Sequence, residues 1–198
     1  MPTDAAPSDR RRFLKLGLLG TAAVFVSGGA LRWFALGYRQ QLSGDDEAIG
    51  LSVKELAVAR ALVEALLPAE DGFPSGISLR VHQRIDEEVW SADEALGRDI
   101  RDGLQLIEHA TLAYGFSARF TSLGVDARRA YFEKLLTSKN ETLRFLAVGL
   151  RQMVHLFYYG HPDAWSAISY PGPLVKDPSP PESSRWYAEL HKSGGRNQ

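Results

Sequence analysis

Residues 141–162 read ETLRFLAVGLRQMVHLFYYGHP and carry the clearest helical pattern in the chain. Apolar residues recur there every three or four positions, which places them on one face of an α-helix. They are Leu143, Leu146, Leu150, Val154 and Phe157. Gly160 ends the pattern, and Pro162 keeps the helix from continuing. The stretch therefore predicts an amphipathic helix over residues 141–159, whose apolar face needs other helices to cover it.

Four upstream segments show the same helical period, and no segment alternates long enough to predict a strand. They cover about residues 52–67, 79–90, 92–114 and 126–136. The expected N-caps of the first three are Ser52, Ser78 and Ser91, and capping boxes with Glu55 and Glu94 support two of them. Leu96 and Ala130 are expected on buried faces. The sequence thus predicts an all-α fold, a compact bundle of about five helices.

The composition fits a globular protein and excludes several functions. The chain has 198 residues, 44% hydrophobic and 24% charged, and its formal net charge of −1 argues against a nucleic-acid binder. It has no cysteine, which excludes disulfides, thiolate zinc sites and iron–sulfur clusters held by this chain. We therefore expect no nucleic-acid partner.

The residue types that most enzymes use do not form a recognisable constellation. The five histidines are never three or four positions apart, the spacing of a helical metal site, and nucleotide-binding glycine motifs are missing. The acidic triplets 45–47 and 86–88 are interpreted as solvated. We therefore expect no catalytic, cofactor or metal site in this chain and a function other than an enzyme's. A catalytic pair of His155 and His161 remains an alternative hypothesis.

The N-terminus has the layout of an export signal, a basic cluster followed by an apolar run from Leu16 to Leu31. It resembles the twin-arginine (Tat) signal through Arg10, Arg11, Phe13, Leu14 and Lys15. The apolar run is shorter than the roughly 20 residues that span a bilayer, so a cleaved signal and an uncleaved anchor both stay open. We expect the Tat translocase as a partner, a periplasmic location and membrane contact through residues 13–37.

The chain divides by composition into four parts. Residues 1–38 form the Tat signal peptide or N-terminal anchor, and residues 39–50 a polar linker. The helical domain covers residues 51–173. A proline-rich C-terminal extension follows over residues 174–198, after an extended aromatic stretch around Trp165 and Tyr170.

Residues 51–173 resemble the gluconate 2-dehydrogenase subunit 3 family. The resemblance rests on a Leu-Leu-Pro-Ala helix end at 66–69 with a Phe-Pro-Ser-Gly loop at 73–76, on Phe120 and Leu123, and above all on FYYGHPDAW at 157–165 with ISYPGP at 168–173. The family usually has glycine where this chain has Ser169. Such proteins are small (gamma) subunits of bacterial membrane-associated flavin sugar dehydrogenases, and many begin with a Tat signal.

This resemblance implies a non-catalytic subunit that supports folding and export of a large flavoprotein and stays bound to it. The implied partner is a glucose–methanol–choline (GMC) oxidoreductase subunit carrying FAD, and a cytochrome c subunit with haem c commonly accompanies it. The interface is expected at Tyr158, Tyr159, Trp165, Tyr170, Pro171 and Gly172, although these residues can equally pack within the chain. A solitary exported or membrane-anchored helical protein that binds a periplasmic ligand is the alternative.

Overall fold

Helix α7 (Glu141–Tyr159) forms where the sequence places its longest apolar repeat. Asn140 caps it by accepting a hydrogen bond from the Leu143 N–H, and Gly160 ends it. The computed structural model describes residues 37–70, 72–174 and 182–193. Within these ranges the structure contains helices and a single isolated β-bridge but no strand. The predicted all-α fold is confirmed.

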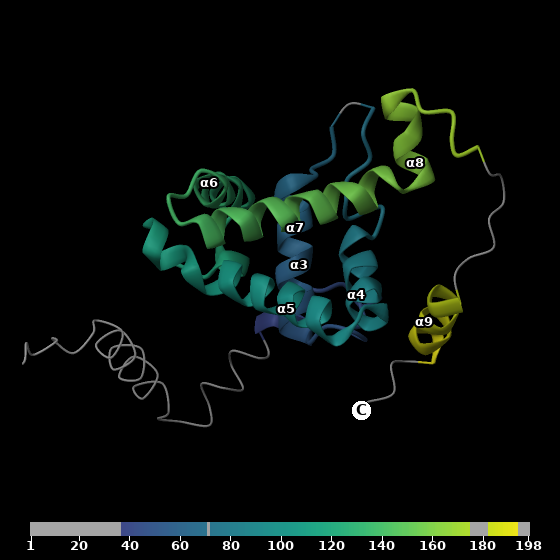
Figure 1. The fold of residues 1–198 in the computed structure, drawn as a ribbon, viewed down its shortest axis with the longest axis horizontal. Helices are drawn as coiled ribbons and strands as arrows, with labels where there is room; N and C mark the ends of the chain where they lie inside the picture. Colours follow the sequence, from purple (N-terminus) through teal and green to yellow (C-terminus); the bar gives the residue numbers. More distant parts are fainter. Residues whose placement is uncertain (1–36, 71, 175–181, 194–198) are drawn as a thin grey trace, which may run out of the picture. The chain divides into compact units, whose positions relative to one another are not determined.

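In the described part of the chain five helices make up the bundle, as the sequence predicts: α3 (Val53–Leu66), α4 (Val81–Ser91), α5 (Glu94–His109), α6 (Val125–Leu136) and α7 (Figure 1). Short elements connect or follow them, namely η1 (Ala110–Tyr114), η2 (Phe120–Ser122), α8 (Pro162–Trp165), η3 (Ser166–Ile168) and α9 (Glu182–Lys192). The chain divides into two units after Gly37, and the bundle lies in the second.

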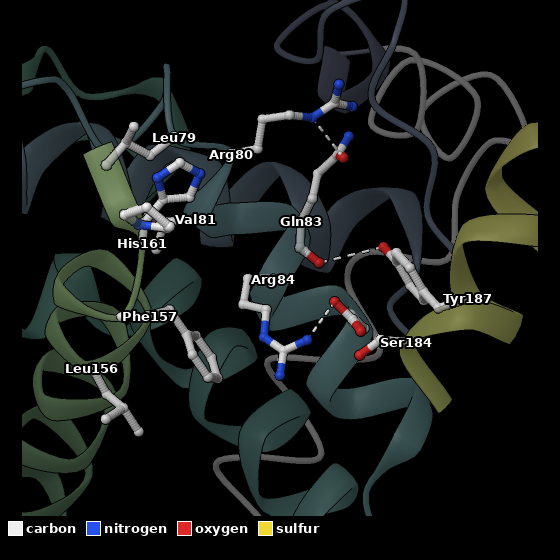
Figure 2. Close-up of a pocket in the computed structure, with 13 residues that line it drawn as sticks. Leu79, Arg80, Val81, Gln83, Arg84, Leu156, Phe157, His161, Ser184 and Tyr187 are labelled. Carbon is white, nitrogen blue, oxygen red and sulfur yellow. Dashed lines mark hydrogen bonds and ion pairs between the residues drawn. The ribbon is translucent and has the colours of Figure 1, made fainter. Parts of the chain in front are cut away.

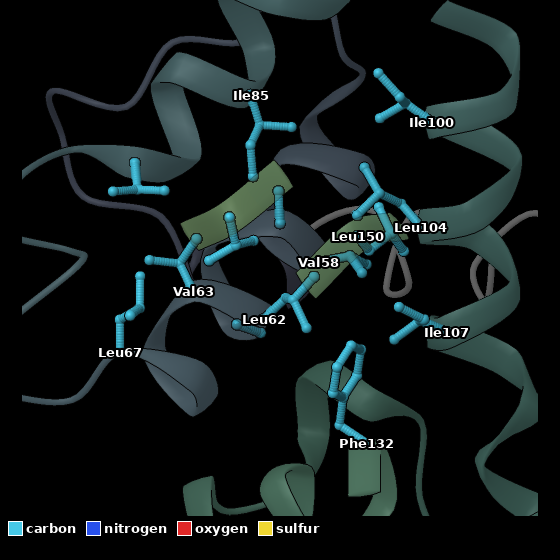
Figure 3. Packing of buried hydrophobic residues seen from close by; sticks show 14 of the residues in the cluster. Val58, Leu62, Val63, Leu67, Ile85, Ile100, Leu104, Ile107, Phe132 and Leu150 are labelled. Atoms are coloured by element: carbon cyan, nitrogen blue, oxygen red, sulfur yellow. The ribbon is translucent and has the colours of Figure 1, made fainter. Parts of the chain in front are cut away.

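Helix α3 is the central element of the bundle and packs against α4, α5 and α6. It is buried on most of its surface because alanines alternate with larger apolar residues such as Leu56 and Leu62. Leu62 points toward residues of α5 and α7, including Leu104 and Leu150 (Figure 3). Each fully buried leucine stabilises the fold by about 2 kcal/mol relative to an exposed one.

One of the three predicted N-caps is confirmed. Ser52 and Glu55 form the expected capping box at the start of α3. The prediction that Ser78 is an N-cap is wrong, because its hydroxyl donates instead to the Ser75 carbonyl in the turn before α4. Ser91 is also not an N-cap: it is the last residue of α4, and the side chain of Asp93 caps α5 by accepting from two backbone N–H groups.

Two residues predicted in the core lie outside it. Leu96 is 44% exposed, because the buried face of α5 follows Gly97, Ile100 and Leu104. Ala130 is exposed because α6 buries its neighbours Tyr131 and Phe132 instead.

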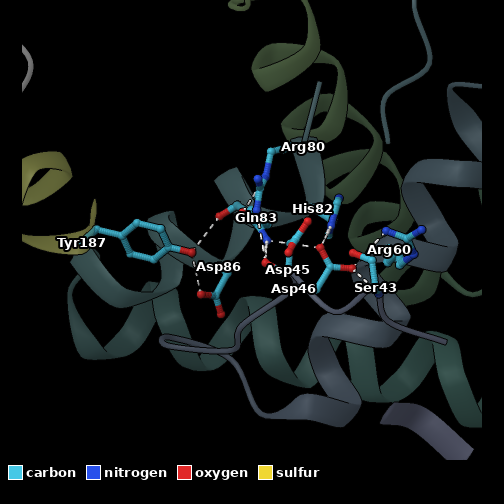
Figure 4. Close-up of polar contacts among 9 residues, drawn as sticks. All are labelled: Ser43, Asp45, Asp46, Arg60, Arg80, His82, Gln83, Asp86 and Tyr187. Atoms are coloured by element: carbon cyan, nitrogen blue, oxygen red, sulfur yellow. Dashed lines mark hydrogen bonds and ion pairs between the residues drawn. The ribbon is translucent and has the colours of Figure 1, made fainter. Parts of the chain in front are cut away.

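The acidic triplets are not simply solvated, since each holds a buried carboxylate with several partners. Asp86 accepts hydrogen bonds from three successive backbone N–H groups at residues 49–51 and from the Tyr187 hydroxyl of α9. Asp46 bonds to His82, Gln83 and Arg60 (Figure 4). Residues 43–51 are thereby attached to α3 and α4.

The partners of these carboxylates set their pKa values. Burial alone would raise the pKa of Asp46, but hydrogen bonds from His82 and Ser43 outweigh it and lower the pKa to about 2. Burial lowers the pKa of His82 against the opposing effect of Asp46, which favours a neutral ring at pH 7. Burial raises the pKa of Asp86 despite its backbone donors.

Candidate protein-binding surface

A groove with a volume of about 790 Å³ lies between α5 and α7 and reaches α4. Helix α5 contributes Leu96 and Ile100 to its lining. Helix α7 contributes Phe145, Leu146, Gly149, Leu150, Met153, Leu156 and Phe157. These positions recur every three or four residues along α7, so they form one continuous apolar wall. A Cβ atom on Gly149 would meet nothing within 4 Å, so the groove is open at that point.

The groove exists because α7 carries more apolar residues than the core covers. Leu150 and Val154 are buried against the bundle, whereas Phe145 is 81% exposed and Leu156 is 68% exposed. Single exposed apolar residues are common on soluble proteins, but a contiguous apolar patch marks an interaction surface. Leu96 of α5 extends the same patch.

A second hollow adjoins the groove and shares Arg84, Leu156 and Phe157 with it. Figure 2 shows Arg84 of α4 between Phe157 and the C-terminal helix. The guanidinium lies 5.4 Å from the centre of the Phe157 ring and pairs with Glu87. Arg84 is therefore already engaged within the chain.

The charges along the groove are mainly negative. Glu88 of α4 and Asp99 and Asp102 of α5 line it, and Arg84 is its one cationic lining residue among those that the structure describes. Within the part of the chain that the structure describes, none of the three carboxylates takes part in a salt bridge or a side-chain hydrogen bond. An apolar wall beside unpaired carboxylates suits the binding of an apolar surface that carries cations.

The aromatic residues predicted at an interface lie at the C-terminal end of α7 and just after it, and they differ in burial. Tyr158 is 2% exposed, and its hydroxyl donates to the Pro74 carbonyl of the loop before α4. Burial raises the pKa of this phenol. Trp165 is half-buried and donates its indole N–H to the Tyr159 carbonyl. These two side chains contact their own chain.

The remaining predicted residues are more accessible. Tyr159 and Tyr170 are 41% and 43% exposed, and Tyr170 packs edge-on against Trp165. Pro171 is exposed, and Gly172 has a φ of 100° at a position where a Cβ would come within 3.2 Å of the Trp165 ring. The turn thus folds onto Trp165 and leaves one face of Tyr170 available. Its role in an interface stays a prediction.

The histidine pair is separated in its contacts. His155 bonds to the Arg151 carbonyl and stacks on Tyr159, whereas His161 caps α8 by accepting from the Asp163 N–H. Over residues 37–70, 72–174 and 182–193, no group of three or more histidines and acidic residues is placed to hold a metal ion. In those same ranges no helix is long and apolar enough to cross a membrane. The signal residues Arg10, Arg11, Phe13, Leu14 and Lys15 lie outside the described residues.

The helical unit matches a known family. A family model described as gluconate 2-dehydrogenase subunit 3 matches residues 53–172, more than half of the chain. The chain belongs to this family. Membership makes it a small subunit associated with a gluconate dehydrogenase-type catalytic complex. No curated protein and no solved structure matches the chain.

The matched region of this subunit 3 protein runs from the start of α3 to Gly172 and therefore contains the groove and the aromatic turn. Ser169 has a φ of 55°. This left-handed backbone favours glycine, the residue that the family resemblance leads us to expect at this position.

The sequence predicts an interface at the aromatic turn, which stays a prediction, and it did not lead us to expect the groove of the subunit 3 domain. The sequence did contain a sign of the groove in α7. Phe145 and Leu156 are apolar but lie on a different face of the helix from the apolar repeat that ends at Phe157. Apolar residues on two faces of a helix predict contacts on both sides. The lack of side-chain partners for Asp99 and Asp102 in the described residues could not be predicted from the sequence, because it depends on which helices lie nearby.

Proposed function

We propose that this subunit 3 protein is a non-catalytic escort. It assists folding of a FAD-bearing GMC-type catalytic subunit, accompanies it through the Tat route to the periplasm, and remains bound to it. The signal-like segment with Arg10 and Arg11 supplies the export address, and the helical domain supplies the binding surface. In this proposal FAD belongs to the partner, and a haem c cytochrome is a third subunit.

The apolar groove between α5 and α7 is the observation that carries the proposal. Family membership gives the chain a place in a dehydrogenase complex, and a stable place needs an apolar surface to bury. Phe145 and Leu156 provide that surface in the described part of the chain. Export of a folded pair also explains a Tat-like signal, because this route carries proteins that acquire their cofactor before export.

The direct test is purification of the tagged full-length protein from its native cells, with an absorbance spectrum and mass spectrometry of what is retained. The proposal predicts a large subunit in equal amount with the spectrum of bound flavin. Recovery of the protein alone and colourless, at concentrations where a stable complex survives, contradicts it.

The export part has its own test in the same cells. Replacing Arg10 and Arg11 by lysine should retain both this protein and the flavoprotein in the cytoplasm, because lysine cannot reproduce the paired guanidinium forks. Arg12→Lys is the matched control and should leave export unchanged. Continued export of the flavoprotein in the Arg10→Lys/Arg11→Lys variant would contradict the escort role.

The groove also favours a second candidate function. Its volume of about 790 Å³ falls in the usual range of small-ligand sites. A solitary periplasmic binding protein would use it for an apolar ligand with a cationic group. Such a protein would be purified without a flavoprotein, and its thermal stability would rise on addition of the ligand.

A further inference from the structure

We propose that the groove between α5 and α7 binds an amphipathic helix of the catalytic subunit, with lysine or arginine residues along the flank that faces α4 and α5. This inference rests on the proposed function and names the partner element that the surface fits. It is carried by the apolar wall of α7 and by the three carboxylates opposite it.

The groove favours a helical occupant because its walls are side chains. A segment that enters an apolar groove loses water from its backbone N–H and C=O groups, and these then need partners. The lining of α5 and α7 offers few, since the backbone groups of both helices bond within their own helix. A helix satisfies its own backbone, so it enters such a groove at the lowest cost.

The carboxylates favour a basic flank on that helix. Glu88, Asp99 and Asp102 all belong to the α4 and α5 side, opposite the exposed Phe145 and Leu156. Covering the groove would remove water from three charges that have no partner within the described chain, which is unfavourable unless cations replace it. Lysine or arginine at helical spacing on one flank provides these cations and fixes the orientation of the bound helix.

A second copy of this chain is a poor occupant. In a twofold-symmetric dimer the same patch of both protomers meets, so one interface would enclose the carboxylates of both grooves. Arg84 could not offset this repulsion, because it already pairs with Glu87. The charges therefore favour a different chain, and the catalytic subunit is the one that family membership implies.

Photo-crosslinking in the intact complex tests the occupant. A photoreactive phenylalanine analogue replaces Phe145 in the full-length protein, and in a control protein it replaces Leu112 of η1, which is 70% exposed and outside the groove. We expect position 145, but not 112, to crosslink to a helical segment of the flavoprotein that carries lysine or arginine. Crosslinks from 145 to a second copy, to residues 1–36 of this chain or to a non-helical or acidic segment would overturn the inference.

Charge reversal tests the flank. Asp99→Lys with Asp102→Lys should weaken binding of the flavoprotein at least tenfold at low salt and should flatten the salt dependence of the affinity. The control is Glu133→Lys with Glu189→Lys, an equal charge change at exposed positions outside the groove. Circular dichroism verifies that both variants remain helical. Equal affinities for the two variants would overturn the inference.

The two proposals fail in different ways. If the wild-type protein retains the flavoprotein but the groove variants bind it equally well, the escort function stands and the groove assignment is wrong. If the wild-type protein retains no flavoprotein at all, the escort function is wrong, and the inference that rests on it falls with it.

Discussion

Asp86 and Glu88 lie two residues apart on α4, yet they belong to two different regions of the molecule. Asp86 is fully buried and accepts four hydrogen bonds that join α4 to residues 49–51 and to α9. Glu88 lines the groove and has no side-chain partner in the described ranges. Some carboxylates of this chain thus stabilise the fold through internal hydrogen bonds, whereas others remain available to another molecule.

The largest expected effect is a loss of stability when the buried carboxylate of Asp86 is removed. Asp86→Ala leaves the N–H groups of residues 49–51 and the Tyr187 hydroxyl without their acceptor, so we expect the free energy of unfolding to fall by about 3 kcal/mol. Urea unfolding measures this. Glu88→Ala is the control, expected within about 0.5 kcal/mol of wild type; equal losses in both variants would remove the distinction.

A second prediction concerns the pH dependence of Asp46→Asn. The pKa of Asp46 is about 2 in the folded chain against 3.8 for an unperturbed aspartate, since the hydrogen bonds from His82 and Ser43 outweigh its burial. Its ionised form therefore stabilises the fold above pH 3.8 by about 2 kcal/mol, and this is lost as the pH falls through 2.

Urea unfolding of the wild type and of Asp46→Asn at several pH values checks this. The difference in free energy of unfolding should be about 2 kcal/mol at pH 7 and vanish near pH 2. A difference for Asp46→Asn that is constant with pH would show that the carboxylate charge is not what matters.

Tyr158 and Tyr159, two adjacent tyrosines at the end of α7, allow the same comparison between a buried and an accessible side chain. Tyr158→Phe removes a partly buried hydrogen bond to the Pro74 carbonyl, so we expect the free energy of unfolding to fall by about 1 kcal/mol, measured by thermal or urea unfolding. Tyr159→Phe, on an exposed side chain, should leave stability unchanged. A larger loss of stability for Tyr159→Phe would show that Tyr159 stabilises the fold and would contradict its predicted place in the interface.

The smallest effect is expected at Ser169. Replacing it by glycine removes the cost of a left-handed backbone at φ 55° and should raise the free energy of unfolding by about 0.5 kcal/mol, while binding of the flavoprotein stays the same. Ser166→Gly is the control at a helical φ of −60°, where glycine should instead be destabilising. Destabilisation by both changes would contradict the backbone argument.

Much of the fold could be predicted from sequence because helical periodicity and local caps are short-range signals. The capping box of Ser52 and Glu55 and the end of α7 at Gly160 were predicted correctly. Ser78 and Ser91 show the limit, since a serine hydroxyl also bonds readily to a nearby carbonyl and then caps nothing.

The polar contacts could not be predicted in the same way. Asp46 and His82 are far apart in the chain, and Asp86 meets Tyr187 only through the packing of α9 on α4. The local sequence pattern therefore indicated, wrongly, that both acidic triplets are solvated. The candidate site depends on the same long-range information, because Phe145 and Asp99 become one surface only when α5 and α7 lie side by side.

Amide hydrogen exchange of the full-length protein, alone and in complex with the flavoprotein, tests most directly whether the groove is the binding surface. We expect slower exchange on binding around residues 96–102 of α5 and 145–157 of α7, with residues 43–51 unchanged. Slower exchange confined to residues 158–172 or to α6, with the groove amides unaffected, would contradict this expectation.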